Sequence, residues 1–474
     1  MFGPPAKSVE GDTLNQIFDI PADLDTPTSA FLKLAPLEPR FLLESVEHGE
    51  RVGRYSFIGF GDGLDVTSRS GTVTAGDATT ETDGTIRGLM DALRGALSRT
   101  PQPGPTSADV PFHGGLVGAV AFDVAYRLPG AGSDHTGEDL EMAFYAPPSI
   151  LAFDHLSRRA ALLHDGSETE RQELRAEVIR LLAGGIPERS GHSGAVDDVT
   201  STMDEAGFVR AVESAKSHIA AGDVYQLVLS VGFEGRADVN PFDVYRGLRL
   251  LNPSPYMYFM DLNGMQIIGS SPEALVRLNG RRAELRPIAG TRPRSIDHDE
   301  DLSAERELLG DAKEAAEHVM LVDLARNDLG RVAVPGTIKV DPYRSIEKYS
   351  HVMHLVSGVA GDLEEGTDSF DLFAAAFPAG TVVGAPKVRA LQLIEAMEPT
   401  RRGFYAGTVG YFGHGGTMDQ AITIRTIVME GDRYRFQAGA GIVADSDPES
   451  EWQEVQSKSG AMRSAIEMAC GGLS

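Results

Sequence analysis

The chain has 474 residues, which is the length of about three average structural units or of one large two-layer fold. Hydrophobic residues at 42% and charged residues at 24% are typical of a folded globular protein and exclude wholesale disorder, collagen-like repeats and coiled coils. The 43 basic and 69 acidic side chains give a net charge of −26, which argues against nucleic acid or an anionic membrane as the main partner.

The first part of the chain reads mainly as strands. Residues 1–7 hold no apolar stretch long enough for a signal peptide, and no window reaches the ~18 apolar residues of a membrane-spanning helix, so we expect a cytoplasmic protein. Short β-branched or aromatic runs bounded by Gly, Asp and Pro then predict strands at 54–60, 65–73, 114–122 and 150–153.

A stretch rich in Pro, Gly, Ser and Asp at 186–201 is typical of a linker. It is a better domain boundary than the similar stretch at 100–109, because helical patterns lie on both sides of it, at 169–183 and 208–221. We therefore divide the chain into an N-terminal portion (10–185), a linker (186–203) and a second portion (204–468).

After the linker, helices and strands mix without the regular alternation of a parallel doubly wound sheet. The patterns predict helices at about 303–326, 385–397 and 449–468, and strands at 257–259, 266–268, 408–412, 421–428 and 434–438. Neighbouring strands are separated by short Gly-containing turns at 263–264, 415–416 and 431–432, which predicts antiparallel hairpins. The fold class is therefore α+β.

Two pairs of glutamates have helical spacing. Glu314 and Glu317 are three residues apart on one predicted helix, and Glu451 and Glu454 repeat the arrangement on the last one, so each pair shares a face. Such pairs can supply oxygen ligands to a hard cation such as Mg²⁺, which keeps positions for water and substrate. The same spacing is also typical of solvated acidic helix faces, and spacing alone does not separate the two.

Two Gly-rich segments could bind an anion. Gly439, Ala440 and Gly441 follow a predicted strand, so their N–H groups could approach a ligand closely, although such a segment is more often a tight turn. Residues 377–387 form a Gly/Pro loop that runs into a helix and could present Thr381 and helix N-terminal amides to a carboxylate. This loop lacks the spacing of a P-loop, which argues against nucleotide binding.

Two further polar residues interrupt apolar runs. His354 lies in a strand-like segment in which His351 falls on the opposite face, and such a histidine is either a satisfied core residue or a proton-transfer group. Arg425 interrupts the run 421–428. A buried arginine needs an anionic partner, which is either an internal carboxylate or the carboxylate of a substrate.

Together and in this order, the motifs resemble those of the chorismate-utilising enzymes and, within that family, of component I, the large subunit of anthranilate synthase. The matching segments are AGDVYQLVLS (221–230), NPSPYM (252–257), SPE (271–273), RPIAGTRPR (286–294) and EHVMLVDLARND (317–328). The resemblance covers 208–468, while 42–45 and 53–59 resemble the regulatory portion of the same subunit. It implies a large antiparallel β-sandwich core flanked by helices and built from two intertwined halves.

The resemblance implies a role for each candidate residue. Glu317 and Glu454 would be direct Mg²⁺ ligands with Glu314 and Glu451 beside them, and His354 would transfer protons and assist departure of the C4 hydroxyl of chorismate. Thr381 would lie near the reacting ring. The substrate would be bound by the group Gly290, Thr291, Tyr405, Arg425, Gly439, Ala440, Gly441 and Lys458.

The implied reaction converts chorismate and ammonia to anthranilate and pyruvate, with ammonia supplied by a separate glutamine amidotransferase subunit in a hetero-oligomer. The only cysteine, Cys470, lies in no nucleophile-elbow context and excludes a disulfide framework or a Cys-based zinc site. Water-using relatives carry a lysine where Gln226 stands, and aminodeoxychorismate synthases typically carry one where Ala289 stands. Some aminodeoxychorismate synthases lack this lysine, so aminodeoxychorismate synthesis remains the alternative function.

A feedback site for tryptophan is also implied by the resemblance. Its residues would be Ser45, Glu44, Pro255, Tyr256 and Met257, although the same residues could simply pack two parts of the chain together. A non-catalytic regulator that binds chorismate or another aromatic acid on the same fold is a further alternative, which the presence of Glu317, His354 and Arg425 argues against.

Overall fold

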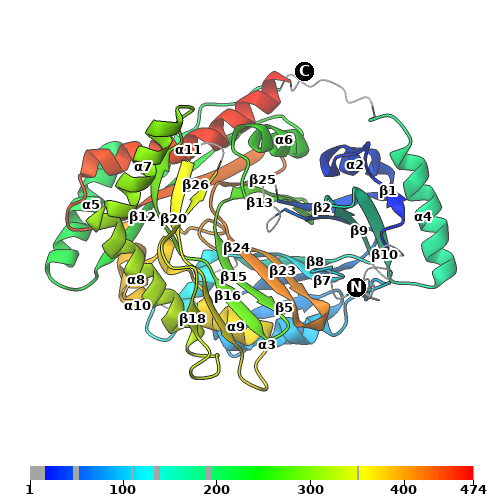
Figure 1. Ribbon diagram of the computed structural model, residues 1–474, viewed down its shortest axis with the longest axis horizontal. Helices are drawn as coiled ribbons and strands as arrows, with labels where there is room; N and C mark the ends of the chain where they lie inside the picture. Colours follow the sequence, from blue (N-terminus) through cyan, green and yellow to red (C-terminus); the bar gives the residue numbers. More distant parts are fainter. Residues whose placement is uncertain are drawn as a thin grey trace, which may run out of the picture.

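The computed structural model describes residues 17–45, 53–107, 110–132, 139–187, 194–349 and 352–472. Within these ranges two large antiparallel sheets form the centre of the molecule, with helices on their outer faces (Figure 1). Aromatic side chains from both sheets meet between them, as in the 6.3 Å contact of the Phe41 and Tyr145 rings. This confirms the α+β class and the β-sandwich core.

The first sheet has twelve described strands. In spatial order they are β1 (Ile20–Pro21), β10 (Arg159–His164), β9 (Ser149–Asp154), β3 (Tyr55–Phe60), β2 (Pro39–Glu44), β13 (Tyr256–Leu262), β14 (Met265–Ser271), β25 (Thr426–Glu430), β26 (Arg433–Ile442), β12 (Gln226–Arg236) and β11 (Thr200–Ser201), and β22 (Gly384–Ala385) also pairs with β12. Helices α5 (Glu205–Ala220), α6 (Pro241–Leu251) and α11 (Pro448–Gly471) cover its outer face.

The second sheet has eleven described strands. Their order is β18 (Lys339–Val340), β21 (Val359–Asp362), β16 (Arg282–Leu285), β15 (Ala274–Asn279), β24 (Met418–Ile422), β23 (Thr408–Gly413), β7 (Gly115–Val120), β8 (Leu140–Ala146), β4 (Leu64–Arg69), β5 (Thr72–Ala75) and β6 (Ala78–Glu81). A small third sheet contains β17 (Ile288–Pro293), β20 (Val352–Val356) and β19 (Ser345–Lys348).

Both large sheets contain strands from the N-terminal and the second portion. In the first, Glu44 of β2 pairs with Met257 of β13, and in the second, Gly118 of β7 pairs with Gly410 of β23. Neither portion can therefore complete a sheet alone, which confirms the expected intertwining of two halves. Of the expected linker, residues 188–193 lie outside the described residues, while β11 pairs with the end of β12.

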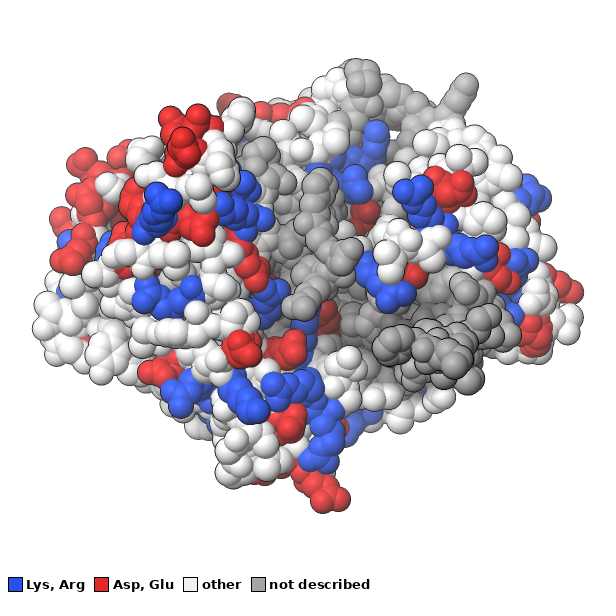
Figure 2. Space-filling view, viewed as in Figure 1, with Lys and Arg blue, Asp and Glu red and all other residues white. Residues whose placement is uncertain are grey.

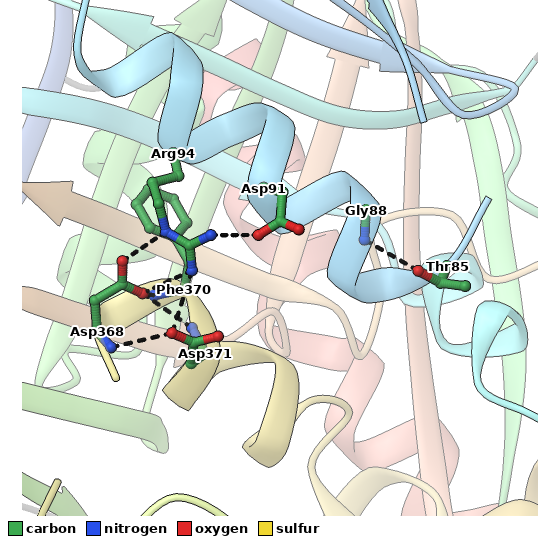
Figure 3. Close-up of polar contacts among 7 residues, drawn as sticks. All are labelled: Thr85, Gly88, Asp91, Arg94, Asp368, Phe370 and Asp371. Atoms are coloured by element: carbon green, nitrogen blue, oxygen red, sulfur yellow. Dashed lines mark hydrogen bonds and ion pairs between the residues drawn. The ribbon is translucent and has the colours of Figure 1, made fainter. Parts of the chain in front are cut away.

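A charged contact joins the two halves outside the sheets. Arg94 of α3 (Ile86–Leu97) reaches Asp368, the N-cap of α9 (Ser369–Ala376), with Nε 2.6 Å from Oδ2, and also bonds Asp371 (Figure 3). The Asp368 carboxylate in turn accepts the Phe370 N–H of the first helical turn. Arg94 thus holds the start of α9, whose other end leads to the loop that carries Thr381.

The remaining helices and short turns complete the described chain. They are α2 (Pro27–Lys33), α4 (Glu168–Leu182), α7 (His298–Gly310), α8 (Ala312–Leu329), α10 (Lys387–Met397) and the 3₁₀ turns η1 (Ala35–Leu37), η2 (Phe122–Arg127), η3 (Gly380–Val382) and η4 (His414–Gly416). None of the described helices is long and apolar enough to span a membrane. Figure 2 shows acidic side chains gathered over α7 at the upper left of the visible face, with basic groups interleaved elsewhere.

Two elements expected in the second portion are divided. The helix expected over 303–326 is two helices, α7 and α8, because Asp311 between them is extended and its side chain accepts the N–H groups of Lys313 and Glu314 as an N-cap. The strand expected over 421–428 is β24 and β25, which belong to different sheets. Arg425 lies between them with φ of 50°, in the left-handed region.

The three expected hairpins are confirmed. β13 and β14 pair across 263–264, β25 and β26 pair across 431–432, and β23 and β24 pair across a turn that contains 415–416. Asn263 and the glycines of these turns have positive φ, which is the backbone conformation that such tight connections need. The run 65–73 is itself divided into β4 and β5 by a turn at Ser70 and Gly71.

Candidate functional site

Four carboxylates from two helices lie close together at one side of the molecule. α8 carries Glu314 and Glu317, and α11 carries Glu451 and Glu454. Burial raises the pKa of Glu317, and the charges of Glu314 and Glu454 raise it further. Burial also raises the pKa of Glu451, with Glu454 adding to the effect. The two pairs predicted from helical spacing therefore face each other and repel.

Several polar groups surround these carboxylates. Lys458 Nζ lies 2.6 Å from Glu454 Oε1, Arg292 Nη1 lies 3.5 Å from Glu314 Oε1, and Gln226 Nε2 donates to Glu317 Oε1 at 3.4 Å. In the part of the chain that the structure describes, no group of three or more His, Cys, Asp or Glu side chains is arranged so that it could hold a metal ion by itself. An open cluster of this kind fits Mg²⁺, which takes a few carboxylates and completes its octahedron with water and substrate oxygens.

The segment Gly439–Gly441 is not a turn but part of β26, paired in register with Val228, Leu229 and Ser230 of β12. A Cβ atom added at Gly439 would lie 2.8 Å from the Tyr405 hydroxyl, and one added at Gly441 would lie 2.7 Å from Gln226 Nε2. Both distances are too short for a side chain. At Gly439 the added atom would also lie 2.7 Å from the Leu229 carbonyl oxygen, so glycine is required there, whereas the Gln226 side chain near Gly441 can move aside.

Arg425 is a buried cation of this region. Burial lowers its pKa, while the nearby Tyr405 and Glu454 favour its charged form. Among the described residues no carboxylate lies within 4.0 Å of the Arg425 guanidinium. The Glu454 carboxylate therefore acts on Arg425 only over a longer distance and forms no ion pair with it. Burial likewise raises the pKa of Tyr405, to about 12. Of the two partners that the sequence left open for Arg425, an external anion fits this geometry better.

His354 lies on β20, next to Gly290 and Thr291, two of the residues expected to bind substrate. Its Nδ1 is 3.2 Å from the Gly290 carbonyl oxygen and 3.0 Å from Thr291 Oγ1. Because a carbonyl only accepts, Nδ1 carries the proton and Nε2 is the free base. Burial and the charge of Arg425 lower the pKa of His354, so its imidazole is neutral at pH 7. His351 lies outside the described residues.

Gly290 lies between His354 and the carboxylate cluster. Its φ is +61°, and a Cβ atom added there would lie 3.0 Å from Glu314 Oε2. The β17 segment that carries Gly290 and Thr291 therefore lies directly against α8. The small sheet, α8, α11 and β26 together form one site, which gathers the residues that the sequence placed at widely separated positions.

One residue of this site was missed by sequence reasoning. Glu273, in the SPE segment, is a buried carboxyl whose pKa is raised to about 7 by desolvation, while the nearby Thr381 hydroxyl and Lys458 lower it in part. Apart from its place in that motif, no chemical pattern in the sequence singles out Glu273. Gln226 Oε1 is buried here without a hydrogen-bond partner among the described residues, which leaves one polar atom for a ligand to satisfy.

A second cavity, of about 550 Å³, lies between the two sheets. All five residues expected for tryptophan line it, namely Glu44, Ser45, Pro255, Tyr256 and Met257. The opposite sheet adds Arg277, Asp419 and Tyr411, which the sequence did not indicate. The Tyr256 hydroxyl donates to Asp419 at 3.0 Å and accepts from Arg277 Nε at 2.9 Å. The volume is that of a typical small-ligand pocket.

The sequence of the chain is similar to those of known proteins. The family model of the chorismate binding enzymes matches residues 38–464. The chain is 45% identical over 460 residues to anthranilate synthase component 1 of Thermus thermophilus, covering 95% of this chain and 97% of that protein. It is 43% identical to the protein of the same name from Streptomyces coelicolor, covering 94% of this chain and 88% of that one.

Solved structures give the same result. Anthranilate synthase component I from Streptococcus pneumoniae superposes with a TM-score of 0.77 at 34% identity, covering 88% of this chain and 94% of that one. The menaquinone-specific isochorismate synthase MenF of Escherichia coli shares the fold with a TM-score of 0.69 at 22% identity, covering 96% and 98%. The chain belongs to the chorismate binding enzyme family.

Proposed function

We propose that the chain is the synthase subunit that converts chorismate and ammonia to anthranilate and pyruvate. The observation that carries the proposal is the pairing of a buried arginine, Arg425, which has no ion-pair partner among the described residues, with a carboxylate cluster on α8 and α11 in a single site. Chorismate is a dianion with carboxylates at its two ends, and a protein with a net charge of −26 needs local cationic groups to bind it.

The two ends of the substrate would be bound by different chemistry. Arg425, Tyr405 and the backbone of Gly439–Gly441 suit the enolpyruvyl carboxylate. Glu317 and Glu454, with Glu314 and Glu451 beside them, would hold Mg²⁺, which when bound supplies the positive charge for the ring carboxylate. The raised pKa of Glu317 supports this assignment, because a divalent cation relieves repulsion between clustered carboxylates.

Two proton-transfer groups suit the chemistry. Ammonia adds at C2 as the C4–O bond breaks, and the departing hydroxyl takes a proton to leave as water. Glu273, with a pKa of about 7, can donate this proton near neutral pH and take one back from the newly added ammonium group, so it replaces His354, which the resemblance suggested for this step. The neutral His354, with Nε2 unprotonated, can then remove the C2 proton as the enolpyruvyl C–O bond breaks, and it can return this proton to the released enolpyruvate, which becomes pyruvate. Thr381 lies beside Glu273.

The nucleophile would be free ammonia. Gln226, beside Glu317, offers an amide where water-using relatives have a lysine, and Ala289 offers a methyl group where a nucleophilic lysine would stand. The aminodeoxychorismate alternative is not favoured, because the similar curated proteins are named anthranilate synthase component 1. A glutaminase subunit would supply ammonia from glutamine in a hetero-oligomer, as the subunit designation of these relatives suggests.

Incubation of the purified chain with chorismate, Mg²⁺ and ammonium at mildly alkaline pH is expected to yield anthranilate fluorescence and pyruvate in equal amounts. Glutamine in place of ammonium is expected to give no product without a glutaminase subunit, because no nucleophile for amide hydrolysis is assigned in this chain. Formation of aminodeoxychorismate or isochorismate would overturn the assignment. Absence of turnover would favour a binding protein.

Tryptophan is proposed as a feedback inhibitor that binds the cavity between the sheets. Ser45→Leu adds a larger side chain to the lining of that cavity, so the tryptophan concentration for half inhibition is expected to rise by about tenfold or more, while the rate without tryptophan stays within about twofold. The measurement is the inhibition curve in the ammonium assay. Ser98→Leu, at an exposed position on the surface, is the matched control, and equal inhibition of the two variants would contradict the proposal.

A further inference from the structure

A fully buried ion pair lies beneath the substrate-binding end of the site. Arg402 is 2% exposed, and its guanidinium bonds the Glu398 carboxylate with two N–H groups, Nε to Oε2 at 2.9 Å and Nη2 to Oε1 at 2.7 Å. Taking both charges out of water costs several kcal/mol, which only good geometry and further hydrogen bonds offset. Neither side chain contacts the carboxylate cluster, so the pair can affect the site only through other residues.

The remaining donors of Arg402 reach two different elements. Nη1 donates to the Val382 carbonyl oxygen of η3 at 2.7 Å, and Nη2 donates to the Val228 carbonyl oxygen of β12 at 2.8 Å. Glu398 extends the network by accepting from Ser230 N at 2.8 Å and from Ser230 Oγ at 2.7 Å. The pair therefore joins the end of α10 to η3 and to two residues of β12.

Each of these contacts lies next to a group of the proposed substrate site. Val228 and Ser230 are the partners of Gly441 and Gly439 in the sheet, and Val382 directly follows Thr381. The guanidinium also lies 5.7 Å from the centre of the Tyr405 ring. One buried pair thus fixes the glycine strand, the Thr381 turn and Tyr405 relative to one another, although these come from separate parts of the chain.

We propose that Arg402 and Glu398 are positioning residues that hold the carboxylate-binding end of the site in its productive geometry. The inference rests on the proposed function, since it concerns how that substrate is held. Lysine cannot replace the arginine, because an ammonium group lacks the planar fork that bonds Glu398 and two separate carbonyl oxygens together. A displacement of about 1 Å at such a site can lower the rate by about 100-fold.

The test compares Arg402→Lys with Arg127→Lys. Arg127 is a well-buried partner of Glu141, with Nε donating to Oε1 at 2.9 Å and Nη1 donating to the Gly84 carbonyl oxygen at 2.7 Å, all within the N-terminal portion. Both variants keep their charge and lose an arginine fork, but only Arg402 contacts the site elements. Arg402→Lys is expected to raise the KM for chorismate about tenfold and to lower kcat/KM about 10- to 100-fold, with the KM for ammonium unchanged.

Arg127→Lys is expected to change neither KM by more than about twofold, although it also loses a buried contact. A wild-type KM in Arg402→Lys, with loss only of thermal stability or of the active fraction, would overturn the positioning role. Should Arg402→Lys fail to fold, Ser230→Ala removes one hydroxyl from Glu398 and is expected to raise the KM for chorismate about threefold. An unchanged KM in that variant would equally count against the inference.

Calorimetric titration with chorismate and Mg²⁺, without ammonium, separates this inference from the proposed function. Absence of anthranilate from the wild-type chain overturns the function alone, provided that chorismate still binds. Binding that weakens about tenfold in Arg402→Lys but not in Arg127→Lys supports the positioning role whatever the product is. Equal affinities overturn it, and absence of binding to the wild-type chain overturns both.

Discussion

Replacing Glu454 by glutamine is expected to lower kcat/KM for chorismate by about 1,000-fold at saturating ammonium, which corresponds to ~4 kcal/mol of transition-state stabilisation. The amide keeps the volume of the side chain but loses the charge that a divalent cation requires. Glu454 is the member of the cluster that influences both Glu317 across the site and Glu451 on its own helix. It is also paired with Lys458 at 2.6 Å, so the substitution frees this lysine as well.

The matched control is Glu449→Gln, an exposed position in the first turn of the same helix, where less than twofold change is expected. Metal binding has a readout of its own, because the only tryptophan, Trp452, lies on α11 between Glu451 and Glu454 and packs against the Phe208 ring at 5.7 Å. Mg²⁺ titration should change its fluorescence in the wild-type chain and only at much higher concentration in Glu454→Gln. Full activity of that variant would refute a metal role for Glu454.

Local patterns predicted the pairing of strands well, because the turns that define it are short. Short Gly-containing turns at 263–264 and 431–432 between strand-like runs predict tight antiparallel connections, and the structure has them in both places. The same reasoning failed at Asp311, where a side-chain cap divides a continuous helical pattern. It also failed at Arg425, where one residue with positive φ takes the chain from one sheet to the other within an apolar run.

The carboxylate site could be predicted only in part from the residues themselves. Helical spacing places Glu314 beside Glu317 and Glu451 beside Glu454, but it does not state that α8 and α11 meet, since a contact between residues more than 130 positions apart leaves no local pattern. The resemblance to a known family supplied that step. It also suggested Gly439–Gly441 as a binding segment, whereas the residues alone favoured a tight turn and the structure has a strand there.

Burial explains what the sequence could not indicate. Nothing in the order of residues distinguishes Glu273 from an exposed glutamate, and its raised pKa depends on the desolvation that the two packed sheets impose. Arg277 and Asp419 complete the cavity between the sheets, yet they lie on β15 and β24, opposite the strand that carries Tyr256. The contacts of the buried Arg402–Glu398 pair likewise depend on the packing of α10 against η3 and β12, which no local sequence pattern indicates.

Replacing Glu273 by glutamine is expected to lower kcat by about 100- to 1,000-fold, because an amide cannot donate a proton to the departing C4 hydroxyl as a carboxylic acid can. The raised pKa of about 7 also predicts a pH dependence. The protonated carboxyl is the active form, so the wild-type kcat should fall as pH rises through about 7. The residual rate of Glu273→Gln should lack this limb, and its persistence in the variant would rule out Glu273 as its source.

The raised pKa of Glu273 also predicts that the stability of the fold depends on pH. That pKa rises from 4.5 to about 7 on folding, so the folded state binds the proton more tightly and the wild-type chain loses stability as pH rises between these values. The loss relative to Glu273→Gln is on the order of 3 kcal/mol above pH 7. Urea unfolding at pH 5 and pH 8 should therefore show the variant gaining relative to the wild type at the higher pH, whereas Glu365→Gln, at an exposed position, should show no such gain.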